Sequence, residues 1–317
     1  MISSWLRPRV VRFLLVSSLL SLAGCNPYGA ITSEIAQKGK IHGNRSTGYD
    51  IDLQYADVNA AFVKQVGALP NVKSLILNDT QVNDGSLAGL ADSSSLKELG
   101  LSQTQITDLG LVKLSRLKAL ESLRLGNTYI SDNGLSHLSH LASLRSLSLT
   151  DTDVSDAGLK NLSALTQLRE LSLSGTQVSD AGLQELAKLS QLDKLNLRNT
   201  QITGEGLAAL EPLRQLKVLS LGYAPISDAA CASIAHMPAL EDLDLAFTNV
   251  GNQALLALVR APTLKRLNLH GTAVDDDGLA ALAQMSHLLH VNLGKTGVSE
   301  AGAAALQHKM QLLSIER

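Results

Sequence analysis

The chain has 317 residues and a formal net charge of −2. This near-neutral balance excludes a strongly basic nucleic-acid binder, and no nucleic-acid partner is expected. Only three residues are Phe and one is Trp, so the core has to be built mostly from leucine.

Residues 1–24 have the pattern of a secretory signal peptide. A basic start is followed by a short apolar run over residues 13–22, which is too short for a membrane-spanning helix. The next residues, Leu22-Ala23-Gly24-Cys25, resemble the lipobox of bacterial lipoproteins. The resemblance implies cleavage before Cys25 and lipidation (palmitate-type acylation) of Cys25. An ordinary signal peptide with a chance cysteine is the alternative.

The expected lipid anchor also predicts a location. Several acyl chains on one residue give stable membrane attachment. Asn26 follows Cys25, which resembles the outer-membrane sorting signal of Gram-negative lipoproteins. We therefore expect a protein of the bacterial cell envelope, anchored to the outer membrane on its periplasmic face or at the cell surface.

Residues 25–47 are predicted to be a short spacer followed by an N-terminal cap. Residues 31–38 favour a helix and residues 40–45 a strand, which would together close one end of a repeat array. Residues 48–71 keep the apolar spacing of the later repeats without their Thr or Gly. This segment is predicted to be a degenerate first repeat.

Residues 72–311 contain ten consecutive units of 24 residues without insertion or deletion. Self-similarity at this period indicates a solenoid, whose long open face favours binding over catalysis. Ala224 stands at the one place where a threonine is missing. The repeated threonines are Thr80, Thr104, Thr128, Thr152, Thr176, Thr200, Thr248, Thr272 and Thr296.

Each unit predicts a strand, a turn and a short helix. In Leu147-Ser148-Leu149 the leucines should face inward, because strand side chains alternate between faces. The following threonine should bond to loop backbone groups and stack with its equivalents as a ladder. An Asp precedes the helical segment and is predicted to be its N-cap. The expected caps are Asp84, Asp108, Asp132, Asp156 and Asp180.

The complete pattern resembles leucine-rich repeats, in the bacterial form with Thr where the commonest repeats carry Asn, and is similar to the cysteine-type repeats. The resemblance implies an α/β leucine-rich repeat solenoid, with a curved parallel β-sheet on the concave side and short helices on the convex side. Residues 312–317 predict a truncated terminal strand. Without a dedicated cap, that strand leaves a tail-to-tail dimer open.

Candidate ligand-binding residues lie mainly at outward strand positions in the second half of the array. Tyr223 and Phe247 fall one repeat apart and are expected to be the only large aromatics on that rim, where aromatics beside arginine are typical interface anchors. The alternative is a solvated sheet with neutralising pairs, for example Asp242 with Arg266. The candidates are Lys194, Arg198, Tyr223, Asp242, Asp244, Phe247, Arg266, His270 and His290.

The sequence predicts no catalytic residue, metal site or cofactor. His137 and His140 have helical spacing but no evident third ligand. Residues 275–277 lack the alternating ligands of a calcium loop. Cys231 occupies a leucine position and is expected to be a small buried thiol.

These observations favour a membrane-anchored recognition module that binds an unknown protein or an extended polymer along its concave face. A structural envelope lipoprotein without a specific ligand is the alternative. A glycan-processing enzyme that uses Asp242 and Asp244 is a third and less favoured hypothesis.

Overall fold

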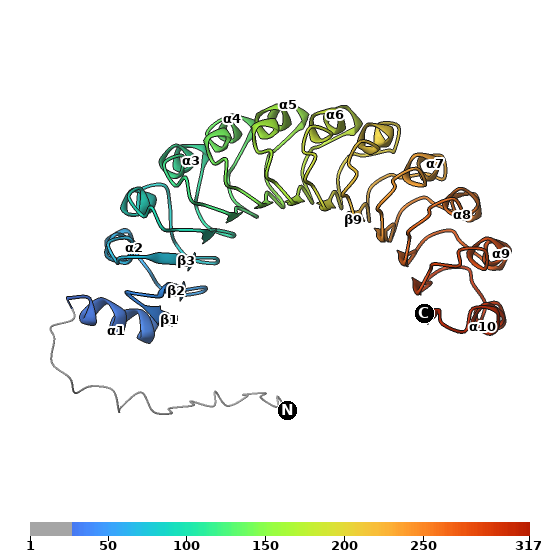
Figure 1. The fold of residues 1–317 in the computed structure, drawn as a ribbon, viewed down its shortest axis with the longest axis horizontal. Coiled ribbons are helices and arrows are strands. Elements are labelled where there is room, and N and C mark those ends of the chain that lie inside the picture. The colour runs from blue at the N-terminus through green and yellow to red at the C-terminus, as the bar shows by residue number, and fades with distance from the viewer. Residues whose placement is uncertain (1–26) are drawn as a thin grey trace, which may run out of the picture.

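The computed structural model describes residues 27–317, and within them the chain forms one 13-stranded sheet whose strand order in space follows the sequence. The strands line the inner side of an arc and the helices its outer side (Figure 1). This arrangement confirms the predicted leucine-rich solenoid. The predicted signal peptide and the lipid-anchor residue Cys25 lie outside the described residues.

The strands are short and keep a constant register. β1 and β2 pair antiparallel, and the later strands pair parallel, each with the residue 24 positions further on from β3 to β13. The buried leucines therefore stay on one face through the array. The bounds are β1 (Lys40–Asn44), β2 (Gly48–Asp52), β3 (Val72–Ile76), β4 (Glu98–Gly100), β5 (Ser122–Arg124), β6 (Ser146–Ser148), β7 (Glu170–Ser172), β8 (Lys194–Asn196), β9 (Val218–Ser220), β10 (Asp242–Asp244), β11 (Arg266–Asn268), β12 (His290–Asn292) and β13 (Ser314–Glu316).

The convex side carries short α-helices and 3₁₀ turns (η). The α-helices are α1 (Gly29–Lys38), α2 (Ala60–Gly67), α3 (Asp108–Leu114), α4 (Asp132–Leu135), α5 (Asp156–Leu159), α6 (Leu183–Leu186), α7 (Ala230–Ile234), α8 (Asn252–Leu258), α9 (Leu279–Leu282) and α10 (Glu300–Lys309). The 3₁₀ turns are η1 (Ser86–Leu90), η2 (Leu138–His140), η3 (Lys160–Ala164), η4 (Asp180–Gly182), η5 (Leu207–Leu210) and η6 (Asp276–Gly278). The helix and strand predicted for the N-terminal cap are confirmed by α1 and β1.

One continuous apolar core runs the length of the arc. It begins at Ile35 of α1 and ends at Leu313, just before β13. Within a repeat, leucines at the strand such as Leu147 and Leu149 and helix leucines such as Leu159 are all buried. Burial of one such side chain stabilises the fold by about 1.5–3 kcal/mol, so the leucines supply the main driving force for stacking.

The repeated threonines bond to the turn that follows each strand, and all of them except the partly buried Thr296 are buried. Each hydroxyl donates to the carbonyl oxygen of the leucine three residues earlier, at 2.5–2.7 Å. The predicted bond to loop backbone is thus confirmed. Each of these bonds lies within one repeat, so they tighten the turn and do not join neighbouring repeats.

The predicted N-cap role of the repeated Asp is wrong. In α4 the cap is Ser131, whose Oγ accepts from the Asn133 N–H, and Asp132 is the first helical residue. The Asp132 carboxylate instead reaches the next repeat, where it accepts from the Ser155 N–H at 2.8 Å and from the Ser155 hydroxyl at 2.5 Å. A Cβ at Gly158 would lie 2.4 Å from Asp132 Oδ1, which explains the repeated glycine.

We call this row of contacts between repeats the carboxylate ladder. Asn252 takes the place of Asp at one interface, where its Oδ1 accepts from the Asp275 N–H. The bonded pairs are Asp84 with Thr107, Asp108 with Ser131, Asp132 with Ser155, Asp156 with Ser179, Asp180 with Thr203, Asp228 with Gly251, Asn252 with Asp275 and Asp276 with Ser299.

The ladder is interrupted between the repeats 192–215 and 216–239, which we call the weak interface. Gly204 stands at the Asp position and has no carboxylate for Ser227. Pro225 has no N–H to donate to Ile202, whereas the equivalent Gln201 donates to the Val178 carbonyl at 2.9 Å. Gly204 and Pro225 therefore remove two polar bonds between these repeats. Ala224 removes in addition the threonine bond within the second of them.

Candidate ligand-binding site

The first outward position of the concave strands carries a row of ion pairs. Lys194 Nζ lies 2.5 Å from Glu170 Oε1, and Arg266 Nε lies 2.7 Å from Asp242 Oδ2. The hydrogen bond to Glu170 raises the pKa of Lys194. The pairing of Asp242 with Arg266 is the neutralised arrangement predicted as the alternative. Such exposed pairs contribute only about 0–1 kcal/mol each.

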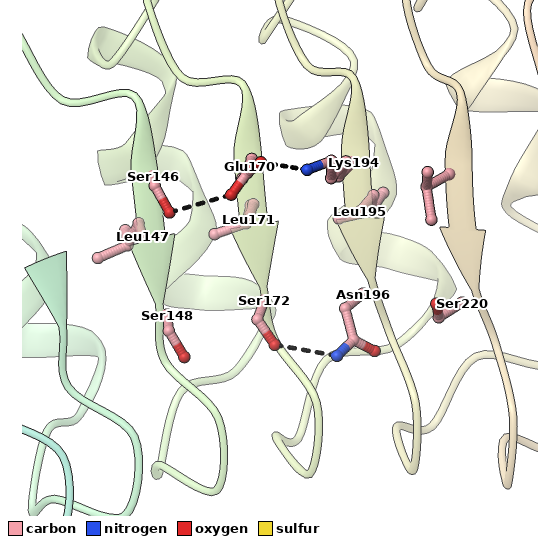
Figure 2. A pocket seen from close by; sticks show the side chains of 11 residues that line it. Ser146, Leu147, Ser148, Glu170, Leu171, Ser172, Lys194, Leu195, Asn196 and Ser220 are labelled. Carbon is pink, nitrogen blue, oxygen red and sulfur yellow. Dashed lines mark hydrogen bonds and ion pairs between the residues drawn. The ribbon is translucent and has the colours of Figure 1, made fainter. Parts of the chain in front are cut away.

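A shallow open hollow of about 320 Å³ lies over strands β6 to β9 (Figure 2). It forms where serines occupy the outward positions, because their small side chains leave space above the sheet. Polar groups rim it: Ser146 Oγ donates to Glu170 Oε2, and Asn196 Nδ2 donates to Ser172 Oγ at 3.1 Å. Lys194 is the one candidate residue among its lining side chains.

An unusual backbone conformation recurs on the rim, beyond the ends of the strands. One residue in each repeat adopts a left-handed backbone, and most occupants are Asn, Asp or Gly, which tolerate it. Tyr223 (φ 62°) and Phe247 (φ 56°) are exceptions. Bulky side chains with positive φ are outliers that cost on the order of 1–3 kcal/mol each and concentrate at functional sites.

The two rings form the centre of a stack that spans consecutive repeats. Their centroids lie 4.7 Å apart with an interplanar angle of 26°. Arg198 Cζ lies 5.0 Å from the Tyr223 centroid, and His270 meets Phe247 edge-on at 5.0 Å. Lys295 Nζ lies 5.5 Å from the Phe247 centroid. We call these five residues the aromatic ridge.

Asp244 holds the ridge in place from the strand below. It forms an ion pair with Arg198, and its Oδ1 accepts from Asn268 Nδ2 at 2.8 Å and from the Ala246 N–H at 3.0 Å. Its side chain is only 17% exposed. Both carboxylates required by the glycan-processing hypothesis, Asp242 and Asp244, are therefore engaged by an arginine.

Glycines provide the space for the ridge side chains. A Cβ at Gly271 would lie 2.6 Å from the Phe247 ring, and one at Gly222 would lie 2.5 Å from Arg198 Nη1. The large side chains of one repeat thus lie over glycines of the next. This close fit fixes their positions.

The structure divides the predicted site residues into two groups. It brings Arg198, Tyr223, Asp244, Phe247 and His270 together at the ridge. It places Lys194, Asp242, Arg266 and His290 in the first outward row, where the first three each pair with an oppositely charged residue. His290 Nε2 is 3.7 Å from a carboxylate oxygen of Glu316.

Two further residues on this rim, Lys295 and Tyr55, are absent from the residues predicted from the sequence. Lys295 belongs to the ridge and lies 48 residues after Phe247, so the 24-residue period could have identified it. Tyr55 has the same left-handed conformation (φ 63°) at the other end of the arc and is 74% exposed. The expectation that Tyr223 and Phe247 are the only large aromatics on this rim is therefore wrong.

Few other reactive groups lie within residues 27–317. Within residues 27–317, no three His, Cys, Asp or Glu side chains gather as a metal site would require. None of the helices in that part of the chain combines the length and apolar character needed to cross a bilayer. Cys231 is buried, and burial, aided by Asp228, raises the pKa of its thiol to about 12. The thiolate form is therefore strongly disfavoured.

Comparisons with known proteins identify a leucine-rich repeat region. The family described as "leucine-rich repeat region" matches residues 51–294. No curated protein matches the sequence.

Three solved structures illustrate the similarity. An internalin from Listeria monocytogenes is 20% identical with a TM-score of 0.56, over 86% of this chain and 87% of that one. The ectodomain of the Arabidopsis receptor kinase HAESA, in complex with a peptide hormone, is 17% identical with a TM-score of 0.61. The match covers 86% of this chain and 50% of that one. The mouse RP105/MD-1 complex is 22% identical with a TM-score of 0.61, over 80% of this chain and 44% of that one. At these identities the likeness concerns the fold.

Proposed function

The chain belongs to the leucine-rich repeat family, and we propose that its solenoid is a binding module for a protein ligand. The observation that carries this proposal is the pair of strained, exposed aromatic residues, Tyr223 and Phe247, beside Arg198. Two of the similar structures support the class of ligand: HAESA is in complex with a peptide hormone, and RP105 with MD-1. Aromatic and arginine side chains are the types that dominate protein interfaces.

The decisive experiment removes the rings without straining the backbone. Asn occupies the equivalent left-handed position at Asn127 and Asn199, so Tyr223→Asn with Phe247→Asn should preserve the fold. We expect this double variant to lose the partners that wild type retains from an envelope extract. Tyr55→Asn is the matched control, because it makes the same change in the same conformation at the other end of the arc. Equal recovery by all three proteins would contradict the proposed site.

We further propose that Cys25 carries a lipid anchor at the outer membrane. The lipobox-like residues 22–25 support this, and α1 begins at Gly29, which would keep the solenoid close to the bilayer. Wild type should incorporate labelled palmitate and fractionate with outer membranes, whereas Cys25→Ser should do neither. Protease treatment of intact cells would distinguish the cell surface from the periplasmic face.

A structural envelope lipoprotein without a specific ligand is the second candidate. The paired charges in the first outward row favour it, since they leave that part of the concave face neutral. It predicts that no concave or ridge substitution changes any association, while Cys25→Ser does.

A further inference from the structure

We propose that the aromatic ridge binds a short, extended, acidic segment of its protein ligand. This inference rests on the proposed binding function and adds the chemistry of the ligand. It depends on which parts of the ridge remain open to a ligand.

The faces of the two central rings are largely covered. Tyr223 and Phe247 cover one face of each other, and the stack continues to Arg198 on the side of the preceding repeat. On the side of the following repeats, His270 and Lys295 contact Phe247. The two residues are nevertheless 50% and 38% exposed. With their faces largely covered, they offer a ligand mainly the ring edges.

Ring edges and cationic groups both favour an anion. The edge of an aromatic ring is the positive part of its quadrupole, and the face is the negative part. A sugar ring that packs on an aromatic face would find that face already covered. A carboxylate, in contrast, would meet ring edges and the N–H groups of Arg198, His270 and Lys295.

The charge balance of the ridge is also positive. Asp244 pairs with Arg198 through Nη1, which leaves other guanidinium N–H groups available. Lys295 is exposed, and its ammonium joins none of the ion pairs formed among residues 27–317. Lys295 therefore contributes an uncompensated positive charge at one end of the ridge.

The length of the ridge indicates an extended peptide. Arg198 and Lys295 lie four repeats apart, or roughly 19 Å at the usual spacing of neighbouring strands. An extended chain of about six residues covers this distance at about 3.3 Å per residue. The hollow over β6 to β9 adjoins the ridge, because Asn196 lines it and accepts the Arg198 N–H at 3.1 Å. A longer peptide would continue into that hollow.

The test uses a fluorescein-labelled ten-residue peptide of alternating Glu and Gly, with the Gln/Gly peptide as its uncharged counterpart. Fluorescence anisotropy should show binding of the Glu peptide that weakens as salt rises. We expect Lys295→Asn and Arg198→Ser each to weaken it by about fivefold or more. Lys160→Gln is the matched control, because it removes an exposed lysine from the convex side. Circular dichroism of each variant checks that it is folded.

Several results would overturn the proposal. Equal binding of the Gln peptide would exclude charge recognition, and unchanged binding by Lys295→Asn and Arg198→Ser would exclude the ridge. Binding of oligogalacturonate in place of the Glu peptide, with the same variant sensitivity, would assign the ridge to an acidic polysaccharide.

The extract experiment separates this failure from failure of the proposed function. If wild type retains a partner that excess Glu peptide does not displace and that Lys295→Asn also retains, only the acidic assignment fails. If wild type retains no partner, the binding function itself fails.

Discussion

Two interfaces between consecutive repeats show how differently stacked strands can be reinforced. Between residues 120–143 and 144–167, Asp132 accepts two hydrogen bonds from Ser155, and the Asp153 N–H donates to the Ile130 carbonyl. At the weak interface, Gly204 and Pro225 supply neither bond. The strand leucines are alike in both, but Cys231, Ile234 and Met237 replace helix-side leucines at the weak interface. The weak interface therefore differs both in its core and in the polar contacts at the edge of the core.

The aromatic ridge begins at the weak interface. The Arg198–Asp244 ion pair joins residues two repeats apart, and the Tyr223–Phe247 stack continues it. The weak interface thus lacks polar bonds on its helix side. The rim at the same place carries the richest set of side-chain contacts. In repeat proteins stability is a sum of local and nearest-neighbour contributions, so such a place can loosen without loss of the rest.

The largest expected effect is on the regular interface. Asp132→Ala should lower the free energy of unfolding by about 2–3 kcal/mol, because it leaves the Ser155 N–H and hydroxyl without their charged acceptor. Urea unfolding measures the change. Asp153→Ala, an exposed Asp in the neighbouring repeat, should change stability by less than about 0.5 kcal/mol. A similar loss in both variants would show that the ladder bonds are not the cause.

A reciprocal pair of substitutions sharpens the comparison. Thr176→Ala should cost about 1 kcal/mol, since it removes the hydroxyl that donates to the Leu173 carbonyl at 2.6 Å. Ala224→Thr should add a similar amount, because the Ala224 N–H already donates to Leu221 in the same turn geometry. Hydrogen exchange of residues 221–230 should slow in Ala224→Thr. Destabilisation by Ala224→Thr would mean that the weak interface has no room for the hydroxyl.

The period predicted most of the fold because its information is local and repeated. Strand register, the inward leucines and the threonine turn follow from one 24-residue pattern. The role of Asp132 did not, since its partner Ser155 lies in the next repeat. Ser131 and Asp132 are both good capping types in adjacent positions, and a one-residue uncertainty at a helix start decides between them.

The ridge was predictable only in part for a similar reason. Tyr223 and Phe247 are one period apart, so their proximity follows from the repeat. The pairing of Arg198 with Asp244 crosses 46 residues, nearly two periods, and depends on a long side chain that passes over Gly222. The left-handed backbone at the aromatic residues could have been inferred from the Asn, Asp and Gly residues at equivalent positions.

The smallest effect concerns pH at the edge of the weak interface. Asp180 is partly buried, which by itself raises its pKa, but hydrogen bonds from the Thr203 hydroxyl and from the Gly206, Thr203 and Gly204 N–H groups outweigh burial and lower it.

A folded-state pKa below the unfolded value of about 3.9 means that the Asp180 carboxylate stabilises the fold above that pH. The stabilisation is lost as pH falls through the folded-state pKa. Wild type should therefore lose more stability than Asp180→Asn between about pH 4 and this lower pKa, when both are unfolded in urea. Asn is a suitable replacement, because Asn252 accepts the equivalent backbone bond. Parallel pH profiles would show that Asp180 does not govern acid stability. The bonds from Thr203 and Gly206 would then stabilise the fold without depending on the charge of Asp180.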